Sequence, residues 1–373
     1  MATRPLIFYS QTSTGADWRC PRAGYYGYLY GGTGIRPIGK GLELFLGTAL
    51  HDGMAAIAGG VGIDAIAAAA VKQVKEGILI EPADYYAAFP EELVFANEQS
   101  ALVEGLLRGF AKHVWPRMQA EYKEVVCVER PMIYRHGPEG QFVFMAKADI
   151  IVRDKEGQLW YIEYKSTSSN KEQWIDSWRT AVQLHSSVKA VEETLGEAVT
   201  GVIVQGLYKG YVNAGKQTSP FCYSYFKQGS PPFTEDRFSY SYTPGYKKYP
   251  SWEMKGGVKR WVDEMPETIL AEQFPQTPPI FLNMDLIDAF FRQQEMRQGE
   301  IFAASDALRE ADPEATQEIL DLTFPQRFDQ CFPSWGKGCP FAKLCHGRNV
   351  DPLAEGFEPR DNEHRKVFEE LVK

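Results

Sequence analysis

The chain has 373 residues, of which 44% are hydrophobic and 24% are charged, and its formal net charge is −9. This composition is typical of a globular protein and excludes a disordered or fibrous chain. No apolar run reaches the roughly 18 residues of a membrane span. The opening residues, MATRPLIFYSQTSTG, also lack a charged segment followed by an apolar stretch, so we expect a cytoplasmic protein with no membrane partner.

Hydrophobic periodicity predicts an alternation of helices and strands along the chain. After a glycine-rich, aromatic opening, helices are predicted from about residue 42, over residues 63–75 and over residues 91–122. Next come three strand-like runs, VVCVERPMIY, QFVFMAKADIIV and QLWYIEYKS. A helix over residues 173–195, the strand VTGVIVQGLY and helices over residues 256–272 and 284–309 complete the pattern. This order predicts a mixed α/β fold.

The segment RDKEGQ, between the second and third strand-like runs, predicts a tight hairpin. A three-residue loop, KEG, gives Gly157 a positive φ, which glycine adopts without steric cost. Asp154 then faces Gln158, and the same register places Asp149 opposite Glu163. The hairpin is therefore predicted to bring two carboxylates together.

An ammonium group is predicted beside these carboxylates. Side chains alternate along a strand, so Glu163 and Lys165 share one face and Tyr164 points to the other. Opposed carboxylates repel each other unless a cation lies between them, and oxygen ligands of this kind suit Mg²⁺ or Mn²⁺. Lys165 would then orient or deprotonate the attacking water. The hairpin alone leaves an alternative open, in which these residues form a solvated surface ion pair.

The same residues carry a family resemblance. Asp149, thirteen intervening residues and then Glu163-Tyr164-Lys165 resemble the signature of the PD-(D/E)xK nuclease superfamily, with Ala148 in place of its proline. Upstream, the segment GTALH, which ends at His51, resembles the G-x-x-x-H helix of the RecB-like branch.

A further helix motif extends the resemblance to the RecB-like branch. Gln183, in AVQLHSS, matches the glutamine of the helical Q-x-x-x-Y motif, although Ser187 stands at the tyrosine position. The order and approximate spacing of the motifs agree with the family over roughly residues 15–210. The resemblance implies a RecB-like core, with a mixed central sheet flanked by helices, a helical N-terminal insertion and a C-terminal cysteine region.

The resemblance also implies roles for individual residues. His51, Asp149, Glu163 and the carbonyl of Tyr164 would hold the metal, Lys165 would assist the hydrolytic water, and Gln183 would position substrate or water. Outside this resemblance, a histidine in an apolar helix is more often a core residue, and Gln183 is an ordinary helix-surface amide. Glu129, in VCVERPM, is interpreted as a solvent-facing strand residue, with a role at the site as the alternative.

Three of the six cysteines are close together in the sequence CFPSWGKGCPFAKLC. Cys331, Cys339 and Cys345 lack the C-x-x-C knuckles of a zinc ribbon and need a fourth ligand to complete a four-cysteine site. The segment from Cys339 to Cys345 resembles the C-P-[FY]-x-x-x-C pattern of iron-sulfur nucleases of the AddB and CRISPR-adaptation kind. In these nucleases one further cysteine precedes the nuclease core, and Cys20 is the candidate for it. This resemblance implies a [4Fe–4S] cluster that joins the chain ends. Zinc, with His346 as a substitute ligand, and unliganded buried thiols are the alternatives.

A local excess of positive charge lies between residues 205 and 262, with nine Lys or Arg residues against three Asp or Glu residues and fourteen aromatic residues. Cations for phosphates and rings for unstacked bases are what single-strand binding requires. The alternative is a solvated face above an aromatic core. The candidate DNA contacts are Lys247, Lys248, Trp252, Lys259 and Arg260.

The sequence therefore predicts a metal-dependent DNA nuclease, an exonuclease acting on ends or single strands in recombination, repair or DNA processing. A helicase or recombination protein would be supplied by another chain. The alternatives are a catalytically weak DNA-binding scaffold of a recombination or CRISPR-adaptation complex and a zinc-stabilised RNA-processing protein. Four segments are predicted, namely an N-terminal region (1–122), the nuclease core (123–212), a basic and helical region (213–325) and a cysteine-cluster region (326–373).

Overall fold

The computed structural model describes most of the chain. The described residues are 5–38, 42–81, 85, 90–167, 171–179, 181–208, 223–227, 240–243, 246–250, 262, 270–271, 273–331, 338–347, 351–361 and 363–372. Within them, no helix is both long enough and apolar enough to cross a membrane.

The N-terminal third is mainly helical. Its elements are β1 (Ile7–Ser10), α1 (Gln11–Arg19), α2 (Pro21–Tyr28), β2 (Ile35–Pro37), α3 (Leu42–Ala58), α4 (Ile63–Ile78), α6 (Pro90–Gly109), a π-helical turn (Phe110–Val114) and α7 (Trp115–Glu121). The predicted helix over residues 91–122 is thus interrupted by a π turn that ends two residues before Pro116, whose missing N–H cannot continue the helical bonding.

The middle of the chain forms the central sheet and two helices. Its elements are β3 (Tyr122–His136), β4 (Phe142–Asp154), β5 (Leu159–Thr167), α8 (Lys171–Trp178), α9 (Val182–Leu195) and β6 (Val199–Tyr208). The four predicted strands are confirmed. The prediction of a single helix over residues 173–195 is wrong, because the extended conformation of Ala181 separates α8 from α9.

The remaining elements complete the fold. They are β7 (Tyr223–Lys227), β8 (Tyr240–Thr243), β9 (Tyr246–Pro250), α12 (Met284–Glu310), α13 (Pro313–Thr323), α14 (Phe328–Cys331), α15 (Ala342–His346), β10 (Phe357–Pro359) and α16 (Glu363–Leu371). The helix predicted over residues 284–309 is confirmed as α12. The helix predicted over residues 256–272 lies almost entirely outside the described residues.

The predicted hairpin between β4 and β5 is confirmed. Gly157 has a φ of +87°, and the backbone N–H of Asp154 donates to the carbonyl of Gln158 at 3.0 Å. The register continues to Ile150 opposite Ile162, where antiparallel pairing of the two strands ends. Asp149 and Glu163 are the next positions, at the point where the two strands begin to separate.

The sheet is mixed, as predicted, and it forks beside β4. β3 pairs with β4 along almost its whole length, whereas β1 and β5 share the opposite edge. β1 runs parallel to residues 142–145, and β5 runs antiparallel to residues 150–153. Residues 146–149 of β4 therefore have no strand partner on that edge among the described residues.

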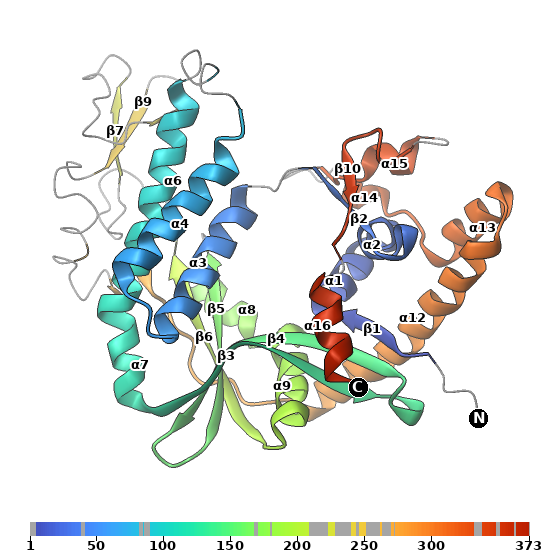
Figure 1. The fold of residues 1–373 in the computed structure, drawn as a ribbon, viewed down its shortest axis with the longest axis horizontal. Coiled ribbons are helices and arrows are strands. Elements are labelled where there is room, and N and C mark those ends of the chain that lie inside the picture. Colours follow the sequence, from blue (N-terminus) through green and yellow to red (C-terminus); the bar gives the residue numbers. More distant parts are fainter. Residues whose placement is uncertain are drawn as a thin grey trace.

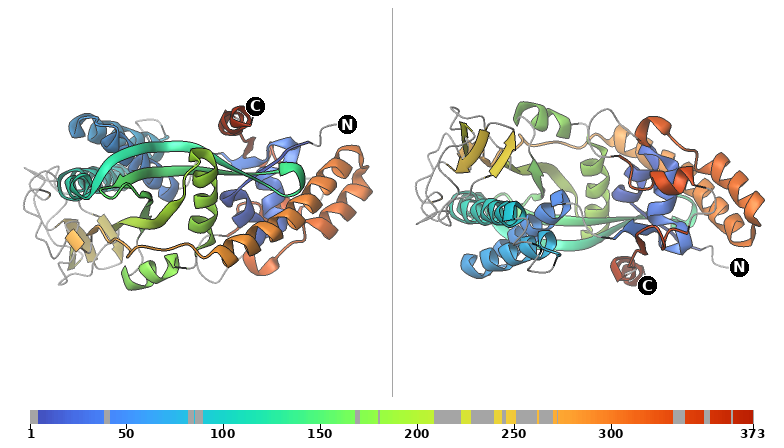
Figure 2. Two further views of the ribbon diagram at one scale, coloured as in Figure 1. Left: turned by 90° about the horizontal axis from the view of Figure 1, so that it is seen from below. Right: turned by 90° about the horizontal axis from the view of Figure 1, so that it is seen from above.

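Helices cover both faces of the sheet (Figures 1 and 2). The α3, α4 and α6 helices bury a cluster that includes Leu50 and Met54 against Ile150 and Ile162 on one face. On the other face, α9 and α12 pack on Phe144 and its neighbours. The left view of Figure 2 shows the C-terminal helix α16 on the same side of the sheet as α4, with α12 on the opposite side. Two apolar cores therefore fix the sheet between helical layers.

The two ends of the chain pack together. β2 pairs with β10, and Phe341, beside α15, stacks on Tyr26 of α2. Buried Arg22 of α2 pairs with Asp321 of α13 at 2.7 Å. Sequence patterns did not predict α1, α2 or β1, because these short segments have little periodicity and the partner strand of β1 lies more than a hundred residues away.

We predict that Gly157→Ala destabilises the protein by about 1 kcal/mol, because alanine is strained at positive φ. A Cβ at Gly157 meets no atom within 4 Å, so crowding does not contribute. Gly299→Ala is the matched control, since that site is equally open but lies inside α12, where alanine stabilises the helix. Urea unfolding of both variants measures the difference, and a loss of stability in both would contradict this account.

Candidate active site

Asp149 lies in the fork of the sheet. Its Oδ2 accepts a hydrogen bond from the backbone N–H of Tyr164 at 2.7 Å. The carboxylate therefore replaces a strand carbonyl as the acceptor at the point where strand pairing ends. The neighbouring Ala148 packs in the core beneath the sheet, whereas Asp149 faces α3 on the other side. The fork thus holds a nearly buried carboxylate with one oxygen directed at a helix.

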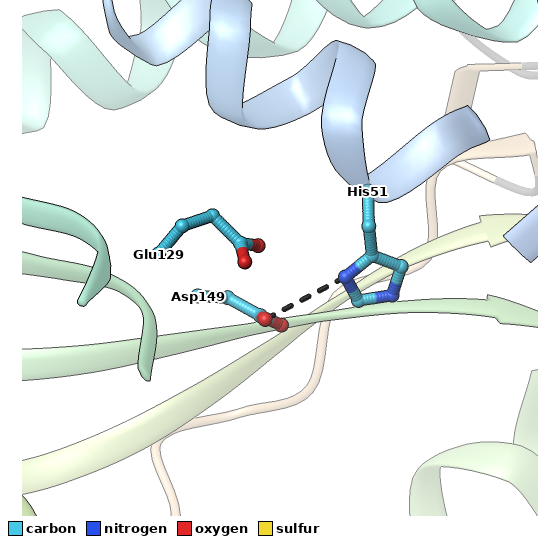
Figure 3. Close-up of side chains that lie close together, drawn as sticks. All are labelled: His51, Glu129 and Asp149. Atoms are coloured by element: carbon cyan, nitrogen blue, oxygen red, sulfur yellow. Dashed lines mark ion pairs between the residues drawn. The ribbon is translucent and has the colours of Figure 1, made fainter. Parts of the chain in front are cut away.

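His51 approaches Asp149 from α3. Its Nδ1 lies 3.5 Å from Oδ1 of Asp149. Figure 3 shows this ion pair as a dashed line. Ala49, Leu50 and Met54 on the same helix are completely buried, so packing of α3 on the sheet fixes where the imidazole points. The side chain of His51 remains 26% exposed, and it is therefore not a core histidine.

Glu129 of β3 completes a group of three potential metal ligands. One ligand atom from each of His51, Glu129 and Asp149 lies within 4.8 Å of the others. Glu129 stands opposite Asp149 in the register and has a φ of +49°, which is uncommon for a residue other than glycine. Its interpretation as a solvent-facing strand residue is wrong, because Glu129 is partly buried and its carboxylate lies with His51 and Asp149.

Glu163 and Lys165 form a second cluster beside the first. Lys165 pairs with Glu163, and the hydroxyl of Tyr161 donates to the same carboxylate. The amide of Gln183, in the first turn of α9, donates to Glu163 at 3.1 Å. The predicted alternation is confirmed, since the ring of Tyr164 is buried in the opposite core. Among the described residues, however, Glu163 is not a member of the three-residue group.

The two clusters interact through their charges. Burial raises the pKa of Glu163, the charge of Asp149 raises it further, and Lys165 opposes both. Burial also disfavours the charge of Asp149, but hydrogen bonding to His51 and the charge of Lys165 outweigh burial and lower its pKa. The pKa of Glu129 is raised, chiefly by burial. Three partly or fully buried carboxylates therefore crowd this site, and a divalent cation would relieve their repulsion.

The four cysteines predicted as cluster ligands lie at the joined chain ends. Cys20 is buried between α1 and α2, Cys331 ends α14, and the backbone N–H of Cys339 donates to the carbonyl of Cys331 at 2.9 Å. Burial raises the pKa of Cys345 to about 12, and the neighbouring Cys339 raises it as well. In the described part of the chain, no three of these sulfur atoms lie within 4.8 Å of one another.

The predicted DNA-contacting residues fall largely outside the described residues. Lys247 and Lys248 lie on β9, of which the backbone alone is described. Trp252, Lys259 and Arg260 lie outside the described residues. The prediction of a basic DNA-contacting surface therefore stays a prediction.

A comparison with protein families identifies the superfamily of the chain. The profile of the PD-(D/E)XK nuclease superfamily matches residues 9–346, and the chain belongs to this superfamily. Its members are hydrolases that cleave phosphodiester bonds with divalent metals. A search of curated proteins finds no match.

Sequence reasoning missed two contributors to the site. Tyr161 precedes Glu163 by two residues, so strand periodicity predicts that they share a face, and this signal was available. Trp178 lies under the Lys165 ammonium, with 5.9 Å from Nζ to the ring centre. Trp178 ends α8, and the break between α8 and α9 was not predicted from the sequence.

We predict that Mn²⁺ stabilises the wild-type protein and that Asp149→Asn removes most of this effect. At 100 times the dissociation constant, binding to the folded state adds about 2.7 kcal/mol. Asparagine keeps the shape of aspartate but loses the charge that attracts the cation. Thermal unfolding with and without Mn²⁺ measures the effect, and Glu76→Gln on the surface of α4 is the control. An equal Mn²⁺-induced rise in the Asp149→Asn protein would place the metal elsewhere.

Proposed function

We propose that the protein is a metal-dependent deoxyribonuclease of the RecB-like branch that acts on DNA ends or single strands. The observation that carries this proposal is the meeting of His51, Glu129 and Asp149 in the fork, with the Glu163–Lys165 pair beside them. The intact set of His51, Asp149, Glu163 and Lys165 favours an enzyme over a catalytically weak scaffold. DNA recombination, repair or processing is the proposed setting, with a helicase or recombination protein as a partner in trans.

The donor set fits a hard divalent cation. Carboxylate oxygens suit Mg²⁺ and Mn²⁺, and a neutral imidazole is a competent further ligand for Mn²⁺. His51, Asp149 and Glu129 would hold the ion, and the family resemblance implies Glu163 and the Tyr164 carbonyl as further ligands. When bound, the ion supplies charge stabilisation at the phosphate and lowers the pKa of a bound water.

Lys165 supplies a cation from the protein itself. Burial lowers its pKa, but the charges of Glu163 and Asp149 outweigh burial and raise it, so the side chain carries an ammonium group. We propose that this ammonium orients the attacking water and offsets charge on the phosphate. Glu163 fixes the ammonium, and Gln183 fixes Glu163 in turn, which makes Gln183 a positioning residue.

The basic segment and the chain organisation extend the proposal. Lys247, Lys248, Trp252, Lys259 and Arg260 are the proposed contacts to DNA beyond the cleavage site. The proposed organisation keeps the four segments 1–122, 123–212, 213–325 and 326–373, with β1 of the first segment completing the sheet of the second.

We predict that Asp149→Ala and Lys165→Ala each abolish Mn²⁺-dependent cleavage while the fold is retained. Labelled linear single-stranded and duplex DNA, circular DNA and RNA of the same sequence serve as substrates, and circular DNA distinguishes exonuclease from endonuclease action. Lys72→Ala is the matched control, because Lys72 is an exposed lysine on α4. Equal degradation by wild type and both active-site variants would assign the activity to a contaminant and end the proposal.

We also propose a [4Fe–4S] cluster held by Cys20, Cys331, Cys339 and Cys345. Four thiolates are the usual donor set of such a cluster. In a tetrahedral zinc site, Zn–S bonds of about 2.3 Å place the sulfurs about 3.8 Å apart. Among the described residues, no three of the four sulfur atoms lie within 4.8 Å of one another, so the proposal of a cluster rests on the cysteine pattern of the sequence. The cluster would join the chain ends and contribute stability rather than hydrolysis.

We predict that anaerobically purified protein is brown, with the broad visible absorption of thiolate-bound iron, and that Cys339→Ser loses this colour. Cys127→Ser should keep it, because Cys127 lies on β3 in the central sheet, away from the joined chain ends. Iron, sulfide and zinc analysis of each preparation gives the result. A colourless protein with stoichiometric zinc would show that the cysteines bind zinc, and it would contradict the proposed iron-sulfur cluster.

A further inference from the structure

A cavity of about 350 Å³ opens beside the fork and has no part in the site described above. It is lined by β1, the start of α1, the end of α2, α12 and the segment that leads into α16. A second cavity of about 470 Å³ shares Phe8, Leu29 and Arg365 with it. The first cavity is large enough for a phosphate group with part of its nucleotide.

Arg360 is one of the lining residues of this cavity. Its guanidinium stacks over the ring of Tyr28, with 4.4 Å from Cζ to the ring centre. Its Nε is buried and has no hydrogen-bond partner, and no carboxylate pairs with Arg360 in the described part of the chain. A buried N–H without an acceptor is costly, so an acceptor from a ligand would stabilise this arrangement.

Both acidic and basic side chains line the cavity. Arg365 supplies a second guanidinium, which lies over Phe8 and pairs with Glu369 at 2.9 Å while remaining 44% exposed. Asp17 also lines the cavity, but Arg297 neutralises it through two hydrogen bonds of 2.7 and 2.8 Å. Asp361 is the other carboxylate of the lining, so two carboxylates match two guanidinium groups there, and Arg360 is the one that no described carboxylate pairs with.

The cavity and the metal group lie on one face of β4. Met145 lines the cavity, and Asp149 follows four residues later along the strand. Because a strand rises about 3.3 Å per residue, the two points are about 13 Å apart. Lys147 stands between them and pairs with Glu129 of the metal group. At about 3.4 Å per nucleotide along a helix axis, a few nucleotides cover this distance.

We propose that this cavity binds a phosphate group of the nucleic-acid strand whose cleavage site lies at the metal group, a few nucleotides away. The planar guanidinium of Arg360 would bind two phosphate oxygens at once, with Arg365 as the second cation. Bound there, the phosphate would hold the strand in one register relative to Asp149. This inference rests on the proposed nuclease function, and it assigns part of the strand path to Arg360, Arg365 and Tyr28.

Single methylphosphonate substitutions test the proposal, because each removes one phosphate charge. Binding of single-stranded oligonucleotides is measured in the Lys165→Ala background, with the neutral group moved one position at a time. We expect one position, a few nucleotides from the cleavage site, to weaken binding several-fold. Adding Arg360→Ala should abolish the sensitivity at that position and lower the slope of log K against log salt by about 0.7.

Controls separate charge, geometry and folding. Arg292→Ala removes an equal charge from an exposed site on α12 and should keep the wild-type pattern. Arg360→Lys keeps the charge but not the two-pronged geometry, so it should recover the salt slope and only part of the affinity. Thermal unfolding of each variant confirms that it is folded.

The outcomes distinguish this inference from the nuclease proposal. If the wild type cleaves DNA but no position loses its sensitivity with Arg360→Ala, the cavity does not bind the strand and the inference is overturned. If a nucleoside monophosphate stabilises the protein through Arg360 without competing with the oligonucleotide, a free nucleotide is the ligand and the inference is again overturned. If the wild type neither binds nor cleaves nucleic acid, both proposals fail.

Discussion

The arrangement of the site depends on the interruption of strand pairing beside β4. β1 and β5 use the same edge of this strand but stop short of each other, and Asp149 lies in the gap. Its carboxylate receives the N–H of Tyr164 that antiparallel pairing would otherwise engage, so a charged group is held between two apolar cores. His51 from α3 and Glu129 from β3 then approach the same point.

The parts of the site that lie within one hairpin could be predicted from the sequence. A two-residue period and the glycine at 157 are local signals, and they gave the register and the shared face of Glu163 and Lys165. His51 required the family motif, since an apolar helix alone does not tell a core histidine from a ligand. The coarse α/β class followed from the order of helices and strands.

Features set by long-range packing could not be predicted. The positive φ of Glu129 is imposed by its surroundings, and nothing in VCVERPM signals it. β1 is a four-residue strand whose partner in β4 lies far along the chain, so its role in forming the fork has no local signature. The cavity at Arg360 likewise combines residues from both chain ends, which the sequence separates by more than three hundred positions.

The most direct test of this account is a crystal structure of the protein with Mn²⁺, in which anomalous scattering locates the ion. The account predicts a manganese peak in the fork, bonded to Asp149 and His51, with Glu129 released from Lys147 or bridging the two. A fork without manganese in crystals grown at saturating Mn²⁺, or an ion bound away from Asp149, would contradict the assignment of these residues to metal.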